Sequence, residues 1–144
     1  MRVYLDTNVL VYAIGGDSSQ RRPCQEILRA VAAGQLTGET SIYTIQEFVR
    51  QRMRRADTEA TPRARQAIDL FADVHPVDGA VVQRAIEIVE GHPGFDIGDA
   101  VHVATALTYR LTTILSADRG LDRVAEIERV DPLDRARLAG LITE

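Results

Sequence analysis

Short apolar runs alternate with longer segments of helical period along this chain of 144 residues. The run at residues 2–6 predicts a strand with Val3 and Leu5 pointing inward. Further runs of strand type lie at residues 36–37, 75–77, 112–115 and 128–130, the last of them an edge strand. Because short strands that alternate with helices build a parallel sheet covered on both faces, the pattern predicts an α/β fold. We expect a three-layer α/β/α sandwich with a mainly parallel central sheet.

The helical segments are marked by apolar residues at every third or fourth position and by capping residues at their ends. We expect helices at residues 7–14, 18–33, 41–55, 62–74, 80–90 and 99–111, with one longer apolar strand as an alternative for the first. The last helix is apolar nearly all round, which indicates burial against the sheet. The helix at 41–55 carries an apolar stripe that we expect to face the core. Its members are Ile42, Ile45, Phe48, Val49 and Met53.

Composition and chain organisation are those of an ordinary globular protein, with 45% hydrophobic and 26% charged residues. We find no internal repeat and no long linker, so residues 1–144 are expected to form one domain. No apolar run approaches the ~20 residues that a membrane span needs. The first six residues lack the pattern of a secretory signal. We therefore expect a cytoplasmic protein that does not contact a membrane.

All 17 basic residues are arginines, which excludes mechanisms that need an amine. Receiver-type signalling domains and haloacid-dehalogenase-like phosphatases have doubly wound sheets, but both use a lysine near the phosphoryl group. A nucleotide-binding P-loop needs a lysine and glycines that this chain does not have. The net charge of -4 argues against coating of nucleic acid by bulk electrostatics and leaves room for a local basic strip.

Four acidic residues are the candidates for chemistry. Asp6 and Asp118 follow strand-type runs, and Glu47 and Asp99 lie in helical segments. In open parallel α/β sheets, ligands bind beyond the carboxyl ends of the strands, where these acids would meet. An all-oxygen set suits hard divalent cations such as Mg²⁺ or Mn²⁺. Taken singly, each acid has a structural alternative as a turn or capping residue, and for Asp96 we favour capping.

The acids belong to motifs that resemble a known family. The motifs are Leu5–Leu10, Glu47, Asp99–Ala100 leading into Ala104–Ala106, and Ser116–Asp122. Their order and spacing resemble the PIN-domain ribonucleases, in particular the small VapC-type toxins of bacterial toxin–antitoxin pairs. The likeness spans essentially the whole chain. It departs from the family at Leu121, where an aromatic residue is usual.

The resemblance implies a divalent-metal-dependent endoribonuclease. Asp6, Glu47, Asp99 and Asp118 would be the catalytic, metal-binding acids for one or two Mg²⁺ or Mn²⁺ ions. A bound ion would polarise the scissile phosphate and activate a water for in-line attack on RNA. The residues expected to support or supplement the four acids are Thr7, Asn8, Asp96, Ser116 and Asp122. His102 lies one turn after Asp99, but in an apolar helix we expect it to be a core residue outside the site.

The resemblance also implies partners. We expect a cognate VapB-type antitoxin that docks along the helix at 41–55 and its neighbours, and a homodimer. Arg50 and Arg54 share one face of that helix and are candidates for RNA or antitoxin contact, as is Arg119. A solvated helix end is an equal alternative for the first two, and for Arg119 we favour neutralisation of the neighbouring Asp118. The rival function from another class is a catalytically silent PIN fold that binds RNA or protein.

Overall fold

The computed structural model describes residues 1–143. Within that range five strands form one sheet: β1 (Arg2–Leu5), β2 (Thr37–Ser41), β3 (Asp73–His75), β4 (Thr113–Leu115) and β5 (Glu128–Val130). Their order across the sheet is β3-β2-β1-β4-β5, and every neighbouring pair is parallel. The chain therefore runs outward from the central strand β1 first to one edge and then to the other, as in a doubly wound fold.

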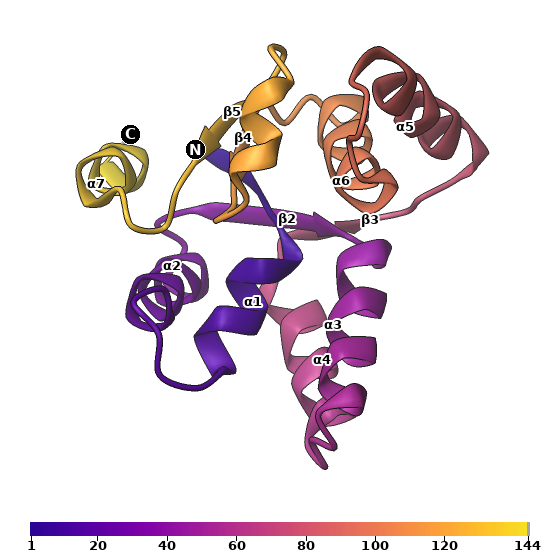
Figure 1. Ribbon diagram of the computed structural model, residues 1–144. Coiled ribbons are helices and arrows are strands. Elements are labelled where there is room, and N and C mark those ends of the chain that lie inside the picture. The colour runs from indigo at the N-terminus through magenta and orange to yellow at the C-terminus, as the bar shows by residue number, and fades with distance from the viewer. Residues whose placement is uncertain (144) are drawn as a thin grey trace.

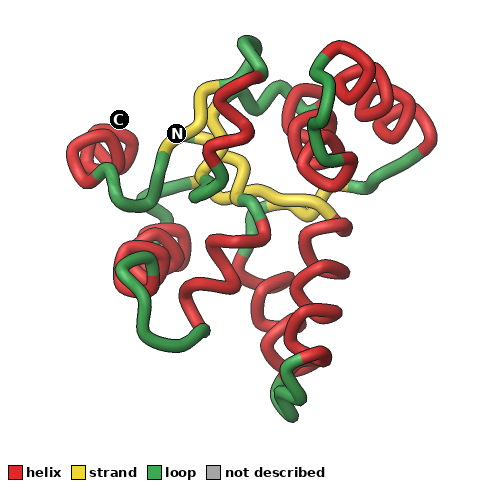
Figure 2. The backbone as a smooth tube through the Cα atoms, in the orientation of Figure 1, coloured by secondary structure: helices red, strands yellow, loops and turns green. Residues whose placement is uncertain are grey.

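Helices connect the strands and cover both faces of the sheet (Figures 1 and 2). They are α1 (Thr7–Ile14), α2 (Arg21–Ala32), α3 (Ile42–Arg54), α4 (Ala60–Leu70), α5 (Gly79–Gly91), α6 (Ile97–Thr108), the short 3-10 helix η1 (Arg119–Arg123) and α7 (Arg135–Thr143). The arrangement is the three-layer α/β/α sandwich that the sequence predicts. None of the helices within residues 1–143 is long and apolar enough to cross a membrane.

The alternation of side chains along β1 divides the interior into two cores. Val3 and Leu5 pack with residues of α1, α2, α3, α4 and α7 on one face. Tyr4 points to the other face and packs with residues of α5, α6 and η1. The two helices that carry Glu47 and Asp99 therefore belong to opposite layers, and their ends meet at the carboxyl edge of the sheet (Figure 1).

Most elements lie where the sequence predicts them, and several boundaries differ by a few residues; strand β2, for example, covers Thr37–Ser41 and not residues 36–37 alone. The fourth helix ends at Leu70 rather than near residue 74, because Asp73–His75 pair with β2 as strand β3. It also begins at Ala60, so that Pro62 lies in its first turn, where a missing N–H costs little. Helix α7 was not predicted, because only Leu138 and Leu141 of this helix are buried and the apolar period is weak.

The apolar stripe of α3 differs from the prediction more seriously. Phe48 is buried, but Ile42 and Met53 are 42% and 65% exposed, and Ile45 and Val49 are half-buried. Helical spacing alone does not say which face the core covers. In this helix Phe48 is buried in the core and Ile45 and Val49 pack against it, as predicted, whereas Ile42 and Met53 are exposed.

Candidate active site

Both catalytic candidates that follow strands are held by the local backbone. Asp6 is the N-cap of α1, and Asp118 is the N-cap of η1. The Asp6 N–H donates to the Leu115 carbonyl at 3.1 Å, which joins the ends of β1 and β4. The two carboxylates therefore emerge from neighbouring strands at the same edge of the sheet.

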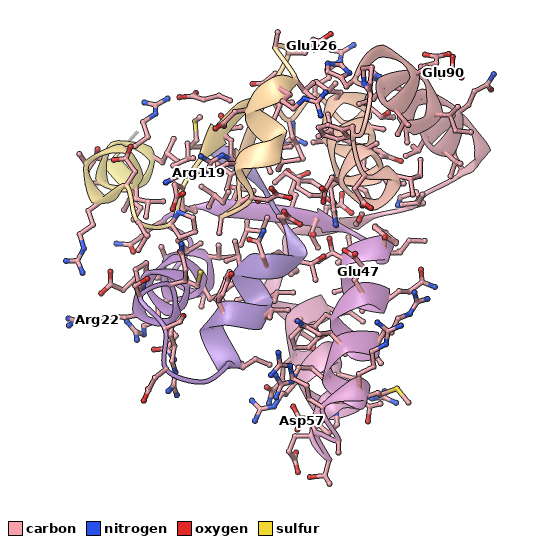
Figure 3. All side chains as sticks on the ribbon, in the orientation of Figure 1. Arg22, Glu47, Asp57, Glu90, Arg119 and Glu126 are labelled. Atoms are coloured by element: carbon pink, nitrogen blue, oxygen red, sulfur yellow. The ribbon has the colours of Figure 1, made fainter. Side chains whose placement is uncertain are left out.

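The other two acids come from the flanking helices. Glu47 lies on α3 near the end that meets the sheet (Figure 3), and Asp99 lies in the first turn of α6. Together with Asp6 and Asp118 they line one open pocket of about 520 Å³. The fold thus gathers at a single surface four acids that are up to 112 residues apart in the sequence, from Asp6 to Asp118.

The carboxylate of Asp6 is almost completely buried and held by three donors. Oδ1 accepts from the Thr7 N–H at 2.6 Å, and Oδ2 accepts from Ser116 Oγ at 2.7 Å and from Asn8 Nδ2 at 3.0 Å. The Asn8 side chain also accepts from the Ala117 N–H, and Ser116 Oγ accepts from the Asp118 N–H at 3.0 Å. Thr7, Asn8 and Ser116 therefore tie this acid to the loop that carries Asp118.

Asp99 and Asp118 lie close enough to interact directly. Burial, together with the carboxylates of Asp118, Asp6 and Asp96, raises the pKa of Asp99 to about 7. Asp96 is the N-cap of α6 and accepts from the N–H groups of Gly98 at 2.8 Å and Asp99 at 3.2 Å, which confirms the capping role expected of it. The region thus concentrates negative charge that no arginine neutralises by an ion pair within residues 1–143.

Glu47 is held differently, by a hydroxyl and an imidazole. Its Oε1 accepts from Thr7 Oγ1 at 2.6 Å and from His102 Nε2 at 2.7 Å. Burial raises the pKa of this carboxyl, but the bonds from His102, Thr7 and Tyr43 outweigh burial and lower it below its ordinary value. Glu47 is therefore ionised at neutral pH, and 32% of its side chain is exposed in the pocket.

His102 is the residue of this region that the sequence prediction misplaced. It is buried as expected, with 2% of its surface exposed, but it also lies in the pocket wall. Nε2 is 2.7 Å from Glu47 and 3.3 Å from Asp6 Oδ1, and Nδ1 is 2.8 Å from the Tyr4 hydroxyl. Burial lowers its pKa, but Tyr4, Asp6 and Glu47 together raise it well above the ordinary value. In the sequence, the signal that could have placed His102 in the site was its position one turn after Asp99.

The donor set fits a hard divalent cation. The pocket offers carboxylate oxygens from four residues, and the raised pKa of Asp99 indicates carboxylates held together against their repulsion. No three acidic or histidine side chains among residues 1–143 are already gathered around one point at metal-binding distance. Mg²⁺ usually binds proteins through one or two carboxylates and keeps several waters.

Two further charged residues named from the sequence lie outside the pocket. Asp122 accepts from Arg129 Nε at 2.8 Å and from Arg129 Nη2 at 3.2 Å, so both of its carboxylate oxygens are hydrogen-bonded. Arg119 is exposed at the start of η1 and does not line the pocket (Figure 3). The carboxylate of Asp122 therefore binds Arg129 and lies outside the pocket that the four acids line.

Arginines line the same pocket on the α3 side. Arg50 and Arg54, the candidates for RNA or antitoxin contact, line it together with Arg55. Arg52, on another face of the helix, is paired with Asp57 at 2.8 Å. Within residues 1–143 the other three make no salt bridge. The pocket consequently has an acidic end near the sheet and a basic end along α3.

Comparison with known proteins gives consistent matches over most of the chain. The family model for the PIN domain matches residues 3–127. Ribonuclease VapC7 of Mycobacterium tuberculosis is 32% identical over 142 residues, with 97% of each chain covered. Two solved structures are similar in fold. VapBC2 from Rickettsia felis bound to a promoter DNA fragment has a TM-score of 0.70 at 13% identity, covering 91% of this chain and 98% of that one. VapC20 of Mycobacterium tuberculosis, a sarcin-ricin loop cleaving toxin, has a TM-score of 0.68 at 17% identity, covering 87% and 98%.

Proposed function

The chain belongs to the PIN domain family, and we propose that it is a divalent-metal-dependent endoribonuclease that acts as the toxin of a toxin–antitoxin pair. The observation that carries the proposal is the meeting of Asp6, Glu47, Asp99 and Asp118 in one pocket at the carboxyl edge of the sheet. The relatives named ribonuclease VapC support the same activity. We take residues 1–144 as one PIN-like domain, and a cytoplasmic location stays a prediction.

The four acids would hold one or two Mg²⁺ or Mn²⁺ ions. When bound, such an ion polarises a phosphate and lowers the pKa of a coordinated water toward neutrality. The protein's own contribution is to hold the acids in place. Ser116 and Asn8 orient Asp6, and Thr7 orients Glu47. Since the pocket contains no lysine and no serine with a histidine base, we propose direct hydrolysis without a covalent intermediate.

The basic end of the pocket would hold the RNA chain. Arg50, Arg54 and Arg55 are exposed and line the pocket next to the acids, so they can contact phosphates that flank the cleaved bond. This explains how a protein with a net charge of -4 can bind a polyanion. The specificity for one RNA would come from the shape of this surface, because single-stranded or looped RNA is read by stacking and shape.

The exposed apolar face of α3 would receive the antitoxin. Ile45, Val49 and Met53 line a groove on this helix together with Gln46, Arg50 and Arg54. Related solved structures are complexes of a toxin with its antitoxin, which supports a VapB-type partner for this chain. An antitoxin segment on this face would also cover arginines that we assign to RNA. The homodimer expected from the resemblance remains part of the proposal.

RNA cleavage by matched glutamate variants tests the activity. Purified wild-type chain, Glu47→Gln and Glu90→Gln are incubated with total bacterial RNA and Mn²⁺, and new 5′-phosphate ends are mapped. Each variant loses one carboxylate, but Glu90 is exposed on α5, well away from the pocket (Figure 3). We expect discrete cuts from the wild type and Glu90→Gln, a loss of at least ~100-fold in Glu47→Gln, and no cuts with EDTA.

Other outcomes would change the proposal. Equal cutting by Glu47→Gln and Glu90→Gln would show that the four-acid pocket is not the active site. If the wild type binds RNA but does not cut it with Mg²⁺ or Mn²⁺, the alternative of a catalytically silent PIN-fold binding module becomes the better description. Asp6→Asn serves as an independent second variant for the same pocket.

A further inference from the structure

A chain of buried hydrogen bonds runs from the core of the fold to the pocket. Ser41, the N-cap of α3, lies 2.9 Å from the Tyr4 hydroxyl, and that hydroxyl lies 2.8 Å from Nδ1 of His102. Nε2 of His102 then lies 2.7 Å from Oε1 of Glu47. Ser41 and Tyr4 are fully buried and His102 nearly so. The chain links β2, β1 and α6 to a carboxylate on α3.

His102 is the donor in the hydrogen bond with Glu47. Oε1 of Glu47 and Oδ1 of Asp6 both face Nε2, at 2.7 Å and 3.3 Å, and ionised carboxylates only accept hydrogen bonds. Nε2 therefore carries a proton and donates, whatever the state of Nδ1. Because the Tyr4 hydroxyl holds Nδ1 and the ring is enclosed by Tyr4 and Tyr43, the imidazole cannot rotate freely.

We propose that His102 is a positioning residue of this metal centre: its Nε2–H lies between the carboxylates of Glu47 and Asp6 and fixes the distance and orientation at which both meet the ion. The proposal rests on the metal-dependent function proposed above. It assigns no contact between His102 and the ion. Outer groups of this kind commonly change metal affinity about 10- to 100-fold when they are removed.

The geometry gives a physical reason for the effect. Without the imidazole, two carboxylates from different elements of the fold face each other across a partly buried gap, and their repulsion moves Glu47 outward. Thr7 still donates to both acids, through its N–H to Asp6 and its hydroxyl to Glu47, but it reaches them only from the start of α1. His102 approaches the pair from α6, the helix that also carries Asp99.

Binding of Mn²⁺ to the purified chain, measured by titration calorimetry in the absence of RNA, tests the inference. His102→Leu removes the donor at similar volume, and His102→Gln offers an amide N–H in its place. Tyr4→Phe removes only the hydroxyl that anchors Nδ1. Thr105→Val is the matched control, because Thr105 is a fully buried polar residue of the same helix whose hydroxyl bonds the Val101 carbonyl.

We expect the Mn²⁺ dissociation constant to rise at least ~10-fold in His102→Leu, by a smaller factor in Tyr4→Phe and His102→Gln, and not at all in Thr105→Val. Cleavage by His102→Leu should recover at saturating Mn²⁺ with KM for RNA unchanged, which a general loss of structure would not produce. Circular dichroism and Tm of the metal-free variants confirm folding. If His102→Leu does not fold, Tyr4→Phe decides the question.

The outcomes separate the two proposals. If the wild type binds Mn²⁺ and cuts RNA while His102→Leu and Tyr4→Phe bind Mn²⁺ as tightly as the wild type, or more tightly, the positioning role is wrong and the nuclease stands. If the wild type neither binds Mn²⁺ nor cuts RNA, the proposed function is wrong and the inference is wrong with it.

Discussion

Replacement of Asp99 by asparagine should stabilise the metal-free protein at neutral and alkaline pH. In the folded state the pKa of this carboxyl is raised from 3.8 to about 7 by burial and by Asp118, Asp6 and Asp96. Below pH ~4 the group is protonated in both the folded and the unfolded chain and has no effect. As the pH rises from ~4 to ~7, the unfolded chain loses the proton first, so stability falls. Above pH ~7 the whole cost is present.

The size of this loss of folding stability follows from the shift in the pKa of Asp99. One pKa unit corresponds to about 1.4 kcal/mol, so the rise from 3.8 to about 7 corresponds to roughly 4 kcal/mol. Asp99 is only partly buried, so water and salt screen the repulsion, and we take about half of this value, roughly 2 kcal/mol. In a domain of this length that corresponds to about 6 °C in Tm. Asparagine carries no charge, so the variant should lack this pH dependence.

Urea and thermal unfolding in EDTA at about pH 5 and pH 8 measure the effect. We expect Asp99→Asn to exceed the wild type by roughly 2 kcal/mol at the higher pH and by less at the lower. Asp69→Asn, a change at an exposed acid on α4, should show no such difference. Adding Mg²⁺ should stabilise the wild type and leave Asp99→Asn unchanged. A variant that is no more stable than the wild type at the higher pH would refute the account of a strained, metal-binding carboxylate.

Three other groups of residues can be tested by substitution. Ser116→Ala removes a 2.7 Å donor to the acid after β1 and should lower kcat/KM for RNA about 10-fold, with the fold intact by circular dichroism; full activity would contradict its orienting role. The double change Arg50→Ala and Arg54→Ala should raise KM for RNA and reduce the salt dependence of binding by a slope of about 0.7 for each phosphate that is no longer bound, while an unchanged slope would place the RNA elsewhere. Glu39→Gln removes the charge of a buried carboxylate that lies 2.6 Å from both Arg2 Nε and His75 Nε2, and it should lower the urea midpoint of unfolding without changing metal affinity; an unchanged midpoint would show that these pairs add nothing to stability.

The parts of the fold that depend on local pattern were predictable from the sequence. The run at Val3–Leu5 carries the alternation that sends Tyr4 to the opposite face, and the all-apolar segment after Asp99 predicts a helix buried against the sheet. Where tertiary contacts compete with local pattern, the prediction was wrong. Residues 73 and 74, which the pattern assigned to a helix, form a strand with residue 75, because pairing with β2 satisfies their backbone groups.

The candidate site likewise has features that the sequence predicted and features that depend on tertiary contacts. The chain by itself determined which acids stand at strand ends and helix starts, because Asp6 and Asp118 end apolar runs and Asp99 opens a helix. Only the tertiary structure decided that His102 reaches Glu47, that Asp122 binds Arg129, and that Met53 at the end of the α3 stripe is exposed. The physical reason is that sequence periodicity specifies the face of an element, whereas the neighbour on that face is set by the crossover connections and the order of strands across the sheet.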